Sequence, residues 1–213
     1  MRLIIASISF AALGSGVLAS KSLASNFKID PTQSRVEWSG SKATGAIHHG
    51  NIAIKEGLFE VKNENILAGL IKVDMNTLSN EDLKESPNLQ DSLVKHLKSA
   101  DFFKVAEHPE STFVVSSVQK KSANQYLFKG DLTIVGVKKP VEFLAQVKME
   151  KNILKGEATL KLDRTKWGLK YASGKLFAQL GDRLIKDEMI LKLKLVAQKD
   201  QVEKRVASKD KIN

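Results

Sequence analysis

The feature that most constrains the fold is an alternation of apolar and polar residues with a period of two. In the stretch QYLFKGDLTIVGV, the side chains of Tyr126, Phe128, Leu132 and Ile134 are in phase. Because successive side chains on a strand point to opposite faces, this pattern predicts strands with one dry and one wet face. The same alternation recurs around Met75, Phe143, Leu160 and Leu191, in the segments 68–78, 139–150, 156–163 and 190–199.

Short segments rich in turn residues separate these strands, as an antiparallel meander requires. Examples are DPTQ at 30–33, VKNEN at 61–65, KKSANQ at 120–125 and MEKN at 149–152. Pro, Asn and charged residues favour chain reversal. About eight such strands can close into a barrel, and closure removes the exposed sheet edges. The sequence therefore predicts an all-β, antiparallel barrel.

One segment, around residues 78–100, breaks the period of two and has helical spacing. Leu89, Leu93, His96 and Leu97 would share one helix face, and Asn88 would be the N-cap. We therefore expect a single helical insertion in the strand array.

The N-terminus indicates export. Met1 and Arg2 precede an apolar stretch that has no charge before Lys21, and small residues at Ala19 and Ala24 suit cleavage of a secretory signal. An uncleaved anchor is the alternative, but glycines interrupt the stretch and it is short for a membrane span. We expect a signal peptide at 1–24, a barrel domain at 25–198 and a charged tail at 199–213, with a periplasmic or secreted location.

The composition limits the chemistry. The chain has no cysteine, which excludes disulfides, thiolate metal sites and a lipid-modified cysteine. The net charge of +10 is spread along the strands, as at Lys192 and Lys194, and we interpret it as a solvated exterior and not as a nucleic-acid site. Contact with an anionic membrane surface and pairing of two barrels stay open.

Three stretches carry a resemblance to a known family. HLKSADFFKVAEHPESTF at 96–113, GDLTIVGVKKPVEF at 130–143 and DRTKWGLKYASG at 163–174 resemble, in that order, the YceI-like, lipid- and polyisoprenoid-binding family. The resemblance implies an extended, lipocalin-like antiparallel β-barrel with an elongated apolar cavity that can hold an isoprenoid chain. It implies a binding protein, in some members periplasmic, and not an established catalyst.

The histidine doublet in TGAIHHGNIAI raises the question of a metal or catalytic site. Strand parity places His48 on the inner face with Ile52 and Ile54 and sends His49 outward, unless Gly50 hosts a bulge. No metal-binding or nucleophile motif links the four histidines, so we expect no cofactor, no bound metal and no catalytic residue.

Several other side chains are candidates for contact with an apolar ligand. Trp38 is in phase with Val36 on the inner face, and Trp167, Tyr171 and Phe177 crowd the segment that would line, cover or fill a cavity. Arg164 would turn inward and pair with an acidic side chain or meet a ligand headgroup. The candidate ligand-binding residues are Trp38, His48, Met75, His96, Phe102, Phe103, Phe128, Phe143, Arg164, Trp167 and Tyr171.

These observations favour an exported carrier that buries a long apolar molecule, such as a polyisoprenoid, an isoprenoid quinone or a fatty amide, for transport or storage. Two alternatives remain. One is a metal- or histidine-dependent enzyme that uses His48, His96 and a carboxylate in the same cavity. The other is a stress-related structural barrel whose interior is filled by side chains.

Overall fold

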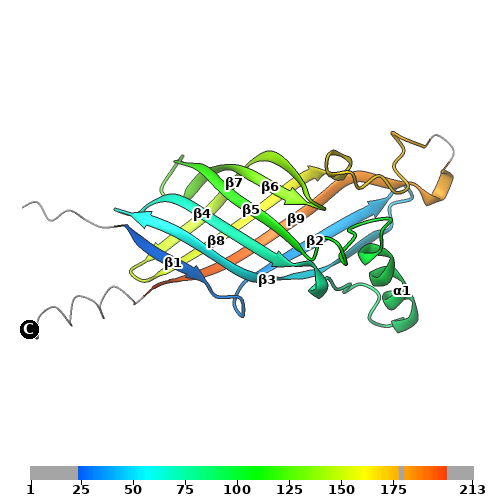
Figure 1. Cartoon of the computed structure of the whole chain (residues 1–213), viewed down its shortest axis with the longest axis horizontal. Helices are drawn as coiled ribbons and strands as arrows, with labels where there is room; N and C mark the ends of the chain where they lie inside the picture. The colour runs from blue at the N-terminus through cyan, green and yellow to red at the C-terminus, as the bar shows by residue number, and fades with distance from the viewer. Residues whose placement is uncertain (1–23, 178–179, 201–213) are drawn as a thin grey trace, which may run out of the picture.

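The computed structural model describes residues 24–177 and 180–200, so most of the predicted signal peptide and most of the predicted tail lie outside the described residues. The described chain is built mainly from strands (Figure 1). They are β1 (Ser25–Ile29), β2 (Arg35–Lys42), β3 (Ile47–Lys62), β4 (Asn65–Asp74), β5 (Glu110–Lys120), β6 (Gln125–Ile134), β7 (Val137–Glu150), β8 (Ile153–Asp163) and β9 (Ile185–Lys199).

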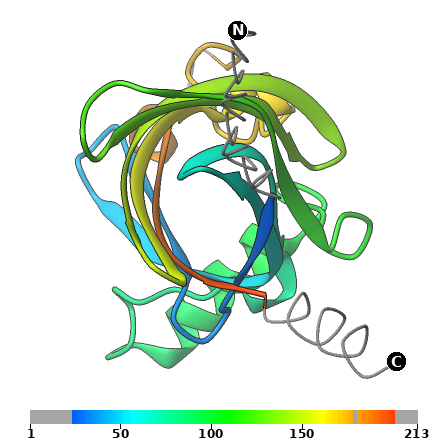
Figure 2. The ribbon, with the colours of Figure 1, turned by 90° about the vertical axis from the view of Figure 1, so that its left-hand side faces the viewer.

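Every consecutive pair from β2 to β9 is antiparallel, and β9 pairs with β2, which closes a ring of eight strands. Figure 2 shows this ring from one end of the barrel. The short strand β1 has the same two neighbours as β2, because both pair with β3 and with β9. It therefore takes the place of β2 in the wall farther along the barrel. The predicted antiparallel barrel is confirmed, with β1 as a ninth, shorter strand.

The alternation in the sequence is the alternation of the barrel wall. Tyr126, Phe128, Leu132 and Ile134 are all buried inside, whereas Lys192 and Lys194 are exposed on the outer face. Burying these apolar side chains is the main favourable contribution to folding, at roughly 1.5–3 kcal/mol for each large one. The core runs along the whole barrel axis.

The two ends of the barrel differ in their connections. At one end, here called the mouth, the long connections 75–109 and 164–184 lie together with the β2–β3 turn (Figure 1). At the other, here called the distal end, three short turns at 63–64, 121–124 and 151–152 join the strands. The mouth is therefore where non-strand segments can build a site.

The predicted helical insertion is present but shorter than the segment 78–100. The helix α1 (Pro87–Lys98) has Ser86 as its N-cap, so the prediction of Asn88 was wrong. The reason is that Pro87 is well suited to the first helical turn, so the helix begins one residue before Asn88. Leu89 is also not on the buried face, because it is 61% exposed. No helix of the described ranges is long and apolar enough to cross a membrane.

Candidate functional site

The largest internal space is a cavity of about 750 Å³ at the mouth, here called the mouth cavity. Its walls come from β2, from β3 at His48, from α1 and the turn that follows it, from the segment that follows β8, and from the start of β9. Aromatic side chains supply much of the surface, namely Trp38, Phe102, Phe103, Tyr171 and Phe177. A volume of this size lies within the usual range for pockets that bind small molecules.

Two smaller cavities continue from the mouth cavity along the barrel interior. The middle cavity, of about 80 Å³, shares Trp38, Phe103 and Met189 with the mouth cavity. The distal cavity, of about 30 Å³, shares Ile71, Phe113, Phe143 and Leu193 with the middle one. The interior is thus a row of three spaces, which is wide at the mouth and nearly filled by side chains farther in.

The walls of the two inner cavities are almost entirely apolar. Ser111 and Thr112 are the polar residues of the middle cavity, and Glu157 is the polar residue of the distal one. Phe143 stands between the cavities, with ring centroids 5.3 Å from Phe113 and 5.7 Å from Phe128. Such walls favour hydrocarbon and offer very little to a charged group.

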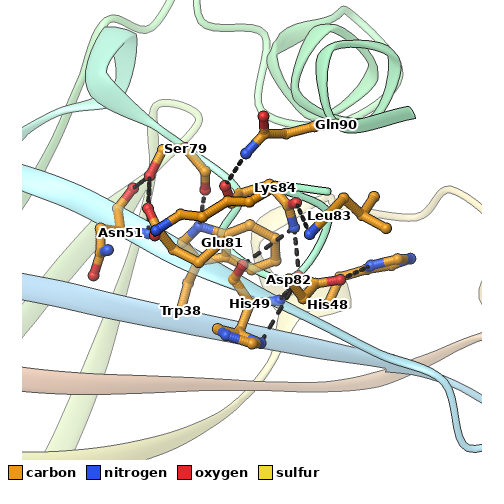
Figure 3. A network of polar contacts seen from close by, with 11 residues as sticks. Trp38, His48, His49, Asn51, Ser79, Glu81, Asp82, Leu83, Lys84 and Gln90 are labelled. Atoms are coloured by element: carbon orange, nitrogen blue, oxygen red, sulfur yellow. Dashed lines mark hydrogen bonds and ion pairs between the residues drawn. The ribbon is translucent and has the colours of Figure 1, made fainter. Parts of the chain in front are cut away.

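The mouth wall depends on a segment that covers the free edge of β3. On the N-terminal side of Ala53, β3 has no β4 partner, and residues 77–82 take that place (Figure 3). The amide of Ser79 donates to the carbonyl of Asn51 at 3.0 Å, and that of Glu81 donates to the carbonyl of His49 at 2.8 Å. Trp38 Nε1 donates to the Ser79 carbonyl at 2.9 Å, which fixes the indole at the cavity wall.

Gly50 makes this close approach possible. A Cβ atom at residue 50 would lie 1.8 Å from the Ser79 carbonyl oxygen and 2.8 Å from Trp38 Nε1. Gly50 pairs with Trp38 in regular register, so it hosts no bulge, and the inner position of His48 follows from parity. The missing side chain at Gly50 therefore leaves the space that Ser79 and the Trp38 indole occupy.

The histidine doublet is split as predicted, yet both residues meet Asp82. His48 lines the mouth cavity with a side chain 29% exposed, whereas the side chain of His49 is 56% exposed. His48 Nδ1 lies 2.7 Å from Asp82 Oδ2, and the His49 amide donates to Asp82 Oδ1 at 2.8 Å (Figure 3).

Asp82 sets the proton arrangement of His48. Burial raises the pKa of Asp82, but hydrogen bonds from the His49 amide, His48 and Asn80 outweigh it and bring this pKa below its usual value of 3.8. An ionised carboxylate only accepts hydrogen bonds, so His48 Nδ1 carries a proton. In the neutral ring, Nε2 is then the acceptor that can meet a polar group of a ligand.

His96, on α1, also contributes to the polar part of the mouth cavity. Its ring packs against Tyr171 with centroids 4.5 Å apart, and Tyr171 is 44% exposed. Nε2 of His96 is buried and has no hydrogen-bond partner among the described residues. A buried polar nitrogen without a partner is costly, and a ligand atom would reach Nε2 of His96 only after the side chains around it moved.

The guanidinium of Arg164 makes its polar contacts within the protein. Its side chain is 3% exposed and donates to the carbonyls of Leu169, Ile185 and Lys186. Asp187 lies 3.7 Å away, and the guanidinium stacks on Phe102 with 5.6 Å to the ring centroid. The structure therefore contains the predicted pairing with an acidic side chain, and Arg164 supports the cavity wall.

The rim of the mouth cavity is cationic. Lys42, Lys170, Arg183 and Lys186 line it, against Asp101 and Glu188. None of these four cations forms an ion pair within the described part of the chain. Within residues 24–177 and 180–200, no three His, Asp or Glu side chains gather in a way that could hold a metal ion.

Comparison with known proteins identifies the family of this chain. The family model of the YceI-like domain matches residues 27–197. The chain belongs to the YceI-like family. A UPF0312 protein of Pseudomonas putida is 34% identical over 137 residues, which cover 63% of this chain and 68% of the relative. Protein YceI of Escherichia coli O157:H7 is 34% identical over 99 residues, or 46% of this chain and 48% of that protein.

Two solved structures share the YceI-like fold. BcnA of Burkholderia cenocepacia has a TM-score of 0.62 at 19% identity, covering 79% of this chain and 98% of BcnA. A polyisoprenoid-binding domain from Saccharophagus degradans, implicated in plant cell wall breakdown, has a TM-score of 0.59 at 14% identity, covering 82% and 98%. At these identities the likeness shows the fold alone.

The YceI-like barrel brings most of the predicted site residues to the row of cavities. Those that line the mouth cavity are Trp38, His48, His96, Phe102, Phe103, Arg164 and Tyr171, and those that line the inner cavities include Met75, Phe128 and Phe143. Trp167 is the exception, because it lines none of these three cavities. It is 2% exposed, and its Nε1 donates to the Leu132 carbonyl at 3.0 Å, so its role is in the core.

The sequence interpretation missed the rim cations and Asp82. Lys42 and Lys186 sit on or beside strands, where alternating lysines resemble those of the outer wall. Asp82 is 34 residues from His48, and no local pattern signals that pairing. The clustering of Lys170 and Arg183 with Tyr171 and Phe177 in one connection was the available signal.

Proposed function

We propose that this YceI-like protein binds a long apolar lipid of isoprenoid type, with its polar head at the mouth and its chain directed into the barrel. The observation that carries the proposal is the row of three cavities, joined through Trp38, Phe103 and Met189 at the first boundary. The polyisoprenoid-binding domain from Saccharophagus degradans shares the fold, which supports the same ligand class.

The chemistry of the row suits a polyisoprenoid, an isoprenoid quinone or a fatty amide. Each buried methylene contributes about 0.8 kcal/mol, so a chain of several isoprene units is held without polar contacts. His48, His96 and the rim cations stand where the polar head would lie. The inner cavities are small, so Phe103 and Met189 must change rotamer to admit a chain, and Met is well suited to such adaptation.

We also propose that the protein is exported, with cleavage after Ala19 or Ala24, and that it shields its lipid from water during transport or storage. The mass of the protein recovered from its producing cells tests this directly. We expect a chain that begins at Ser20 or Ser25 and is found outside the cytoplasm. An intact Met1 in the cytoplasmic fraction would contradict export.

Solvent extraction of the natively purified protein, followed by mass spectrometry, tests the binding function. We expect one long-chain lipid per protein molecule. No lipid in the extract, together with no uptake of isoprenoids in vitro, would refute the carrier. Stoichiometric zinc, iron or copper in protein purified without chelator would instead favour the enzyme that uses His48 and His96.

A further inference from the structure

A group of exposed side chains beside the mouth cavity forms an amphipathic surface, here called the lip. It consists of Lys170, Tyr171, Leu176, Phe177 and Arg183, all in the connection between β8 and β9. Tyr171 is 44% exposed, Leu176 49% and Phe177 51%. Large apolar side chains gathered beside cations that form no ion pair with another described residue are unusual for a surface that meets only water.

Backbone hydrogen bonds fix the turn that carries Leu176 and Phe177. The amides of Leu176 and Phe177 both donate to the Ser173 carbonyl, at 3.1 and 3.0 Å, which makes a tight turn. Lys175, which directly precedes Leu176, reaches back to Asp163 at 2.7 Å and to Asp187 at 3.5 Å. These contacts fasten the turn to the barrel end.

The lip is continuous with the mouth cavity. Tyr171 and Phe177 line the cavity and are also among the exposed large apolar residues, and Lys170 and Arg183 belong to its rim. The lip thus combines apolar side chains and cations next to the entrance of the cavity. This combination suits the boundary of a bilayer, where phosphate headgroups meet acyl chains.

We propose that the lip docks on the surface of an anionic lipid bilayer and places the mouth cavity against it. This inference rests on the proposed lipid-binding function and adds the partner from which the lipid is taken or to which it is given. Tyr171, Leu176 and Phe177 enter the headgroup boundary, and Lys170 and Arg183 meet the phosphates. A lipid then passes between bilayer and barrel without crossing water.

Flotation with lipid vesicles tests the docking, using the chain as recovered from cells with the same N-terminus in every variant. The protein binds vesicles of mixed phosphatidylglycerol and phosphatidylcholine and not vesicles of phosphatidylcholine alone. Binding falls as salt is raised, because salt screens exposed charges. Equal binding to both kinds of vesicle would overturn the electrostatic part of the proposal.

Two pairs of variants locate the surface. Leu176→Gln with Phe177→Gln lowers vesicle binding at least about tenfold, from the lost burial of two large apolar groups, whereas Leu67→Gln with Val114→Gln, on residues each 47% exposed, leaves it unchanged. Lys170→Gln with Arg183→Gln lowers binding roughly tenfold. Its control is Lys148→Gln with Lys155→Gln, because these exposed lysines lie opposite each other on the neighbouring strands β7 and β8. Equal losses in variants and controls would overturn the lip.

The lipid content of the same preparations separates the two proposals. Leu176 lines none of the three cavities, so Leu176→Gln alone weakens vesicle binding and leaves the extracted lipid unchanged. Wild-type protein that binds vesicles but contains and takes up no lipid would refute the carrier and retain the lip. A dimer in solution that the lip variants dissociate, without any vesicle binding, would assign the lip to a second copy and overturn the proposal.

Discussion

The mouth and the distal end of the barrel are made from the same strands but have different purposes. At the mouth, the connections 75–109 and 164–184 bring α1, the covering segment 77–82 and the lip around a cavity of about 750 Å³. At the distal end, tight turns such as 151–152 close strands around a space of about 30 Å³. The strands thus provide an apolar interior, and the long connections provide access to it.

The largest effect we expect is from the glycine beneath the covering segment. Gly50→Ala destabilises the fold by about 3 kcal/mol, because the new Cβ meets a backbone carbonyl that has no free space. Gly156→Ala, at the distal cavity, is the control, since a Cβ there meets nothing within 4 Å. Urea unfolding curves measure both, and equal losses would show that the mouth is no more tightly built than the distal end.

Two substitutions should block the row of cavities at different depths. Met189→Trp fills the boundary between mouth and middle cavities, and we expect the extracted lipid per chain to fall more than about tenfold, since many methylenes lose their site. Ala158→Leu narrows the distal cavity alone, so lipid is retained but shorter chains are preferred. Mass spectrometry of the extracts measures both the amount of lipid per protein and the length of its chain. An unchanged chain-length profile in Ala158→Leu would show that the lipid chain stops short of the distal end.

The ion pair that fastens the lip segment gives the mouth a pH dependence. Hydrogen bonds from Lys175 and Thr165 hold the pKa of Asp163 at about 2, below the ordinary 3.8. A lowered folded pKa stabilises the protein above the ordinary value, and this stabilisation is lost as the pH falls from about 4 toward 2. We expect Asp163→Asn to cost about 1–2 kcal/mol at pH 7, which allows for solvent screening of Lys175.

Unfolding free energies between pH 7 and pH 3 test that window. The difference between wild type and Asp163→Asn should be constant above about pH 5 and shrink below about pH 4. Glu142→Gln, which removes the exposed wall pair with Lys129, is the matched control and should cost less than about 0.5 kcal/mol. A difference that grows on acidification would contradict the assignment.

The smallest effect concerns the histidine doublet. His48→Gln should weaken lipid retention about fivefold, since one hydrogen bond at the polar end is worth about 1 kcal/mol. His49→Gln should leave retention unchanged, because its side chain lies outside the cavity. Equal losses in lipid extracted from the two variants would contradict the division of the pair.

Strand parity in the sequence was enough to predict the barrel wall and most of the lining of the two inner cavities. Phe128 and Phe143 follow directly from a period of two, because a strand has no other way to bury them. Parity ends at Asp163, where a short 3-10 helix (Arg164–Trp167) begins, so it could not assign Trp167 to the core. The sequence could not reveal the roles of Gly50 and Asp82 for another reason. Gly50 meets Ser79, 29 positions away, and Asp82 meets His48, 34 positions away, and only the folded chain brings these residues together.

The path of the lipid chain through the row of cavities can be measured in a crystal of the protein loaded with a long alkyl or isoprenoid chain brominated at its far end. Anomalous scattering locates the bromine independently of the rest of the ligand. We expect the bromine in the distal half of the barrel, among Phe128, Ala145 and Leu154, with the polar head near His48 and His96. A bromine confined to the mouth cavity, or a chain bound outside the barrel, would contradict a carrier that buries its lipid along the barrel axis.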